Sequence, residues 1–199
     1  MGEDTPSLAS TWQLITDAQA EYTLRVTRAA GWLGCEPALP GHESSQVTQH
    51  MANAIFAMLA GDWHTVEQEC VRACKHWYLG AFDALAVTVK FQKLVLEYII
   101  EVLRERWTEY LSTAEKVLRD QEAILREISL PPTDQVGDVQ ATKEQIEKIQ
   151  ALALALLNCS NALNEQITSL TLLAGPENIL TLVDEARKRW GRAPHDPDE

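Results

Sequence analysis

The sequence has little positive charge. Its 199 residues include 17 Lys and Arg against 29 Asp and Glu, for a formal net charge of −12, and no Lys/Arg cluster rises above this acidic background. Proteins bind nucleic acids largely through Lys and Arg contacts to phosphates, so nucleic acid is excluded as the main partner. Hydrophobic residues nevertheless make up 46% of the chain, which is ordinary for a folded globular protein.

Long apolar runs are also missing. No window approaches the roughly 18 apolar residues of a membrane-spanning helix, and the segment from Met1 to Asp4 lacks the basic and apolar regions of a secretory signal. We therefore expect a cytoplasmic chain without a membrane span. The cysteines form no Cys-x-x-Cys pair, so reduced thiols are expected and neither a zinc site nor a redox motif is indicated. They are Cys35, Cys70, Cys74 and Cys159.

The motifs of common enzyme classes are absent as well. The chain contains no G-x-S-x-G, no Walker A sequence, no G-x-G-x-x-G and no H-E-x-x-H. It also lacks the Glu-x-x-His pairs that a ferritin-like di-iron site requires. No cofactor is indicated by these motifs, and we expect a protein that is not an enzyme.

What the chain does contain is helical periodicity. Apolar residues recur at intervals of three, four or seven, which predicts helices over about 7–30, from 43 to Gly61, and from Asp62 onward to 128. Asp62 is placed to cap the third of these, and Gly80 marks its only plausible break. No stretch alternates as a β-strand does, so the predicted fold class is all-α.

The segment from Ala81 to Ile128 contains neither Pro nor Gly and keeps helical spacing throughout. A single helix of this length would extend roughly 70 Å, against about 30 Å for the width of a small domain. Its second half would have to pack on later helices or on a second copy of the chain. We favour the second copy and predict a homodimer.

The carboxyl-terminal third predicts further helices. Two prolines within Ser129–Asp138 end the long helix, because each disfavours a helical residue before it. A capping box at Thr142–Gln145 begins a helix of about 30 residues, and Gly175 with Pro176 separates it from a last helix that Gly191 ends. The expected organisation is a helical domain at 1–130, a linker at 131–141, a C-terminal helical segment at 142–191 and a disordered tail at 192–199.

Several polar side chains are candidates for a binding site. His64 and Glu67 share a helix face and could hold a metal, although such spacing more often reflects structural ion pairs. Cys70 and Cys74 also share a face, with His76 nearby, and could take up a metal or a chromophore. Buried free cysteine usually behaves as a small hydrophobic residue, which is the interpretation we favour.

Aromatic and acidic side chains are the other candidates. Trp63, Trp77 and Tyr78 flank the histidines and could line a ligand pocket, whereas aromatics at helical spacing more often belong to a core. Acidic residues recur every fourth position between Glu97 and Glu109, which is typical of a solvated helix face.

The segment from Trp77 to Phe82, which opens the long helix, resembles the start of the penultimate globin helix in sensor globins. Leu59 to Trp63 is similar to the turn before the haem-ligand region of that family, and Asp120 to Ser129 resembles its exit linker. The likeness covers residues 10 to 130. The family includes globin-coupled sensors and haem-free stressosome globins. It therefore implies a globin-like bundle with a long exit helix, here with an additional C-terminal helical pair.

The chain departs from this family at the haem ligand. Haem-binding members carry a proximal histidine shortly before the Trp-Tyr pair, where this chain has Glu67 and Gln68. His64 or His76 could still ligate haem iron, which requires an axial side chain. The resemblance favours a haem-free pocket that holds a small apolar ligand, such as a fatty acid.

The resulting hypothesis is a non-enzymatic sensory and regulatory module. A haem-free, globin-like sensor would dimerise and pass a conformational change to a protein partner by signal transduction. One alternative is a haem- or chromophore-binding sensor, and a second is a structural helical adaptor without ligand. The residues that would contact a bound haem or ligand are His64, His76, Trp63, Trp77 and Tyr78.

Overall fold

The computed structural model describes residues 8–35, 37, 39–128 and 138–191. No strand occurs among these residues, which confirms the all-α fold class. None of the described helices combines the length and apolar character that a membrane crossing requires. The helices are α1 (Leu8–Leu33), α2 (Leu39–Ala60), α3 (Trp63–Glu127), α4 (Val139–Ala174) and α5 (Pro176–Trp190).

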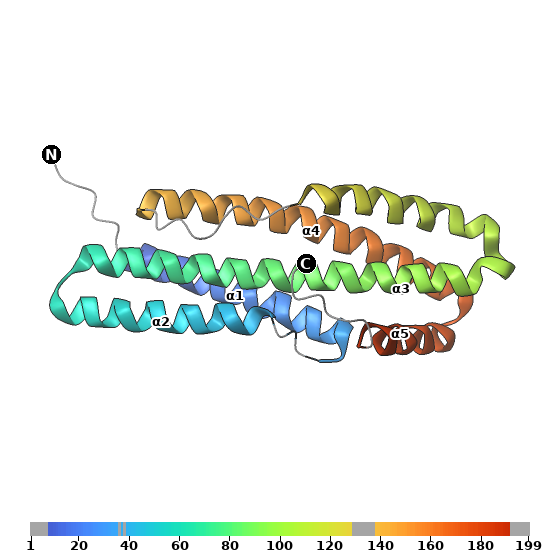
Figure 1. Ribbon diagram of the computed structural model, residues 1–199, viewed down its shortest axis with the longest axis horizontal. Coiled ribbons are helices and arrows are strands. Elements are labelled where there is room, and N and C mark those ends of the chain that lie inside the picture. The colour runs from blue at the N-terminus through green and yellow to red at the C-terminus, as the bar shows by residue number, and fades with distance from the viewer. Residues whose placement is uncertain (1–7, 36, 38, 129–137, 192–199) are drawn as a thin grey trace.

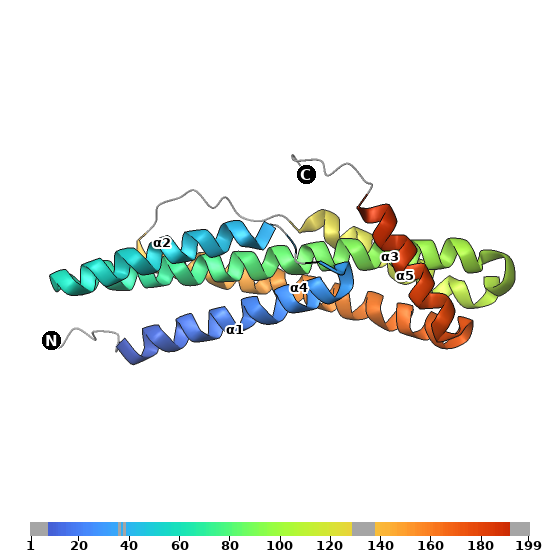
Figure 2. The same ribbon diagram turned by 90° about the horizontal axis from the view of Figure 1, so that it is seen from below.

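The central element of the fold is α3, on which α1, α2 and α4 all pack. These helices lie along one long axis and form an elongated bundle, with α5 crossing one end (Figures 1 and 2). Neighbours α1 and α4 hardly touch each other, although both lie against α3. The arrangement differs from a globin, whose helices pair at about 50° around a haem pocket.

Within this bundle α3 folds back on itself. Lys93 Nζ lies 2.6 Å from Glu122 Oε1, and Arg104 pairs with Glu115 at 3.2 Å. A straight helix would hold Lys93 and Glu122, 29 positions apart, about 44 Å from each other. Figure 1 shows the reversal at one end of the bundle. The expectation of a straight helix of roughly 70 Å was wrong, and the argument for a homodimer that rested on it is lost.

The reversal occurs without Pro or Gly because of what it buries. Leu111 and Ala114, which follow the bend, are 2% and 0% exposed, whereas a projecting rod would leave them in water. Full burial of a leucine side chain such as Leu111 contributes about 1.5–3 kcal/mol, which a projecting rod would not gain. Packing on the bundle therefore outweighs the preference for a continuous helix.

The sequence suggested a helix break at Gly80, and this prediction was wrong, because Gly80 lies inside α3. A Cβ atom at this position would lie 2.6 Å from Cε2 of Tyr22 in α1 and 3.3 Å from Cβ of Glu43 in α2. The missing side chain thus lets two neighbouring helices approach α3 closely.

The ends of the helices are set by caps. Asp62 accepts a hydrogen bond from the backbone N–H of Thr65 at 3.1 Å, which confirms it as the cap of α3. The cap of α4 is Asp138, which accepts from the N–H of Ala141 at 2.8 Å. The helix was predicted to begin with a capping box at Thr142–Gln145, but it begins one turn earlier, because Asp138 accepts hydrogen bonds from the free N–H groups there.

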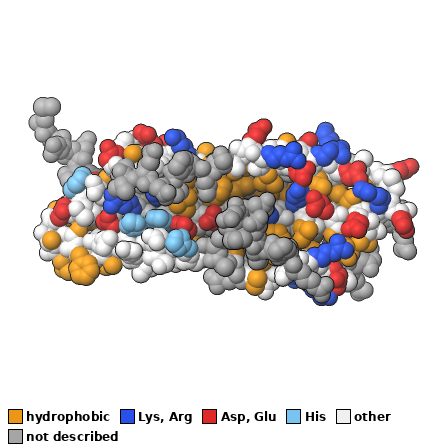
Figure 3. Space-filling model, in the orientation of Figure 1, with side chains coloured by type: hydrophobic (Ala, Val, Ile, Leu, Met, Phe, Trp, Pro, Cys, Tyr) orange, Lys and Arg blue, Asp and Glu red, His pale blue; other side chains and the backbone are white. Residues whose placement is uncertain are grey.

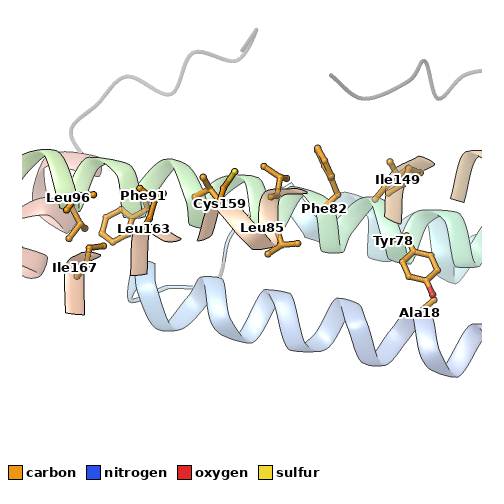
Figure 4. Close-up of a cluster of buried hydrophobic side chains, with 14 of the residues drawn as sticks. Ala18, Tyr78, Phe82, Leu85, Phe91, Leu96, Ile149, Cys159, Leu163 and Ile167 are labelled. Carbon is orange, nitrogen blue, oxygen red and sulfur yellow. The ribbon is translucent and has the colours of Figure 1, made fainter. Parts of the chain in front are cut away.

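One hydrophobic core joins all five helices. Figure 4 shows Phe91 and Leu96 of α3 beside Leu163 and Ile167 of α4, while Tyr78 points toward Ala18 of α1. Helices on both sides of the predicted linker thus share this core. The predicted linker at 131–141 lies outside the described residues as far as 137, and its last part was wrong, because α4 already begins at Val139. The tail at 192–199 also lies outside the described residues.

Candidate functional site

A groove of about 360 Å³ runs between α1 and α4, with α3 as its floor. It exists because α1 and α4 both pack on α3 and hardly touch each other. Its volume falls within the range of about 300–1,000 Å³ that is usual for small-molecule sites. The lining residues are Asp17, Glu21 and Arg25 from α1, Tyr78 and Ala81 from α3, and Gln150, Ala153, Leu154 and Leu157 from α4.

The wall formed by α1 is polar. Asp17, Glu21 and Arg25 are spaced four apart and therefore lie on one helix face. Arg25 is 8% exposed and holds Glu21 at 2.5 Å, while Asp17 accepts a hydrogen bond from Gln13 at 2.7 Å. One carboxylate of this wall is thus neutralised by Arg25, and the wall keeps one net negative charge at Asp17.

The wall formed by α4 is apolar, apart from Gln150. Leu154 is 58% exposed, and Leu157 packs partly against the core. Tyr78 at the floor is buried and hydrogen-bonded to the Gln150 side chain, and burial raises the pKa of its hydroxyl group above the ordinary value. The hydroxyl is therefore neutral at physiological pH, and the groove as a whole is amphipathic.

Of the residues proposed from the sequence, only Tyr78 lines this groove. Trp77 instead packs on Tyr22, with 4.5 Å between ring centroids, and Trp63 is 51% exposed at the start of α3. Consecutive positions on a helix point about 100° apart, which is why Trp77 and Tyr78 face different neighbours.

The two candidate histidines lie apart from the groove. His64 is exposed, and its Nε2 atom lies 3.0 Å from Nε2 of Gln68. His76 faces α2, where its Nδ1 lies 2.6 Å from Oε2 of Glu43. The described residues that line the groove include no histidine, so this space does not provide the axial histidine of a globin-type haem site.

His76 belongs to a polar cluster that joins α2 to α3. Its ring stacks on that of His50 at 5.1 Å between centroids. Buried Glu69 accepts hydrogen bonds from Asn53 and Arg72 and lies 2.8 Å from Nδ1 of His50. Burial by itself would raise the pKa of Glu69, but these three partners hold it below the ordinary value.

This cluster is best explained as structural. Each carboxylate of the cluster has a partner on the facing helix, which satisfies polar groups that would be costly to bury alone. Within the described part of the chain, no group of three or more His, Cys, Asp or Glu is arranged to hold a metal ion. The proposed pair of His64 and Glu67 is also not formed, because Glu67 contacts Lys143 of α4 at 3.2 Å.

The cysteines confirm the interpretation as small core residues. Cys70 and Cys74 are 4% and 0% exposed, and Cys159 is buried as well, whereas Cys35 is exposed. Burial raises the pKa of Cys74 to about 12, with a further contribution from Cys70. A thiolate that could ligate a metal or attack a chromophore is therefore disfavoured there.

Sequence reasoning missed most of the groove. The four-residue spacing of Asp17, Glu21 and Arg25 was visible and could have identified a polar face of α1. The facing wall could not be found this way, because only the pairing of helices shows that Leu154 and Leu157 lie opposite.

A comparison with protein-family models finds no match, and comparisons with curated proteins and with solved structures find none.

Proposed function

We propose that this chain is a non-enzymatic regulatory module that binds a small amphipathic molecule in the groove between α1 and α4. The observation that carries the proposal is the placement of the groove. Its walls belong to two helices that share α3 as a support and hardly touch each other. A ligand that contacts both walls would fix their spacing and so change the surface offered to a protein partner.

The lining chemistry selects the class of ligand. Leu154, Leu157 and Ala153 fit an apolar body, while Asp17 favours a neutral or cationic head group. A fatty acid fits less well than the sensor-globin resemblance suggested, because its carboxylate would meet Asp17 and because Arg25 is already paired with Glu21. An alkylamine matches both walls.

Hydrogen bonds connect α1, which forms one wall of the groove, to α5 at the end of the bundle. Arg187 of α5 donates hydrogen bonds to the backbone oxygen atoms of Trp32 and Gly31, at 2.9 and 3.0 Å. These carbonyl groups belong to the last turn of α1, whose middle forms the groove wall. A change in the position of α1 would therefore be transmitted to α5.

Octylamine and octanoate are suitable probes for calorimetric titration of the purified chain. We expect octylamine to bind at least tenfold more tightly than octanoate, since Asp17 repels a carboxylate. Leu154→Lys should abolish octylamine binding by placing a positive charge on the apolar wall. Leu172→Lys is the matched control, because Leu172 is an exposed leucine of α4 outside the groove. Octanoate binding more tightly, or equal loss in both variants, would refute the proposed ligand class.

Each of the two alternative functions, a haem-binding sensor and a structural adaptor, predicts a different experimental result. A haem-binding sensor would show a Soret absorption band when purified, and its loss in His64→Ala or His76→Ala would identify the ligand. A structural adaptor would carry no small molecule, so mass spectrometry of extracts from the native protein would detect none. We expect a colourless protein with a bound amphipathic molecule.

A further inference from the structure

The outer face of α2 carries no charged side chain over most of its length. From Ser44 to Gly61 the sequence contains no Asp, Glu, Lys or Arg, in a chain with 46 such residues among 199 (17 basic and 29 acidic). The other helices all expose acidic residues to solvent, Asp17, Glu97, Glu147 and Asp184 among them. The exposed face of α2 therefore differs in kind from the rest of the described surface.

This face is also apolar near the turn that connects the end of α2 to the start of α3. Ile55 and Phe56 are 50% and 70% exposed, Met58 and Leu59 are 42% and 76% exposed, and Trp63 follows just beyond the turn at 51%. Figure 3 shows hydrophobic side chains gathered at this end of the molecule. Large apolar side chains that are exposed together usually mark an interaction surface.

The spacing on α2 is that of a helix-pairing seam. His42, Ser45, Gln49, Ala52, Phe56 and Leu59 follow one another at intervals of three and four, and each of them is exposed. This alternation is the a and d pattern through which two helices pack side by side. The seam changes along its length from polar and small residues to the large Phe56 and Leu59.

We propose that α2 is the interface of a homodimer, in which it packs antiparallel on α2 of a second copy. Two acidic copies repel each other wherever their acidic surfaces meet, and a two-fold interface places each patch against itself. An uncharged patch meets that requirement without any opposite charge. A two-fold axis near Ile55 and Phe56 would also place Leu59 of one copy against the small Ala52 of the other.

The expected dimer is reversible. Helix α2 ends at Ala60, so with the axis near Ile55 and Phe56 the two copies of α2 overlap over residues 51–60, about 15 Å of helix. One helix face of this length lies below the interfaces that bury about 800 Å² per partner. We therefore expect dimerisation to depend on concentration. The interface does not depend on the α1–α4 groove, so this inference stands or falls independently of the proposed ligand.

Analytical ultracentrifugation over a hundredfold range of concentration tests the proposal. The native chain should move from its monomer mass of 22.3 kDa toward twice that value. Leu59→Glu should remain a monomer at every concentration, because it places like charges on both sides of the axis. Leu172→Glu is the control and should dimerise as the native chain does, since Leu172 is equally exposed, at 80%, on another helix.

The register can be tested by cross-linking. In a Cys35→Ser background, Phe56→Cys should form a disulfide-linked dimer on mild oxidation, because position 56 lies near the axis. Ser45→Cys should not, because an antiparallel pair places the two copies of position 45 far apart. A native chain that stays monomeric, a Leu59→Glu variant that still dimerises, or cross-linking only through position 45 would each overturn the proposal. Unchanged circular dichroism of the variants at low concentration confirms that they are folded.

Discussion

Lys93 and Glu122 form an ion pair within a single helix, with 2.6 Å between Nζ and Oε1, although 29 positions separate them. This contact is possible only because α3 reverses direction between them. The reversal brings the second half of α3 back onto the bundle, and no projecting rod remains to recruit a second copy. If the chain dimerises, the surface that favours it is on α2.

The reversal of α3 can be measured with spin labels. In a Cys35→Ser background, labels at the exposed positions Lys90 and Ala123 would be about 50 Å apart along a straight helix. We expect a distance of less than about half that value by pulsed electron resonance, because the two halves lie side by side. A distance near the straight-helix value would show that the reversal does not occur in solution.

Gly80→Ala should destabilise the fold even though Ala is the better helix former. The new Cβ would lie 2.6 Å from the ring of Tyr22, which is itself held against Trp77. Overpacking of this kind costs about 1–3 kcal/mol. Gly31→Ala in α1 is the matched control, because a Cβ there meets nothing within 4 Å. It should leave stability unchanged or raise it by up to about 1 kcal/mol, as measured by urea denaturation.

Asp83 should make stability depend on pH. Burial, assisted by nearby Glu43, raises the pKa of Asp83 to about 6 from 3.8. A carboxyl group with a higher pKa in the folded state stabilises the fold fully below its unfolded pKa, and this contribution is lost as the pH rises through the folded pKa. We expect Asp83→Asn to raise the free energy of unfolding by up to about 3 kcal/mol at pH 7.5 relative to its effect at pH 4.

Denaturation curves at the two pH values provide this measurement. The control is Glu147→Gln, which alters an exposed carboxylate of α4 and should have the same small effect at both. Equal effects of Asp83→Asn at pH 4 and pH 7.5 would contradict a raised pKa.

The thiols should differ sharply in reactivity. Cys35 is exposed, whereas Cys70, Cys74 and Cys159 are buried, and burial raises the pKa of each of the three buried thiols. Ellman's reagent should therefore titrate one thiol in the native chain and four after unfolding in guanidinium. A second thiol that reacts rapidly under native conditions would show that the core around α3 opens more readily than its packing indicates.

Arg187 should contribute to stability through the end of α1. Its guanidinium group donates to the backbone oxygen atoms of Trp32 and Gly31, and hydrogen bonds from charged groups contribute about 1.5–3 kcal/mol each when buried. Because Arg187 is partly exposed, we expect Arg187→Met to cost about 1–2 kcal/mol in total. Lys188→Met should cost less, since the ion pair of Lys188 with Glu185 stays within α5. Hydrogen exchange at residues 31–34 should accelerate in the first variant alone.

Local features of the fold could be predicted from the chain itself. Helical periodicity, the cap at Asp62, the end of α2 at Gly61 and the stop at Gly175 with Pro176 each depend on a few neighbouring residues, and the structure confirms them. The burial of Cys70 and Cys74 and the solvated acidic face between Glu97 and Glu109 also follow from spacing alone. These predictions succeeded because helix formation and helix ends are governed by contacts within about one turn.

The reversal of α3, the role of Gly80 and the groove were decided by tertiary structure. Periodicity shows which residues of a helix are buried but not what buries them. The same stripe around Leu111 could therefore have packed on a second copy or, as it does, on the chain's own bundle. A glycine such as Gly80 can mark a helix break, and only the position of the Tyr22 ring shows that Gly80 instead allows two helices to approach closely. The groove depends on the distance between α1 and α4, two helices held apart because each packs on α3.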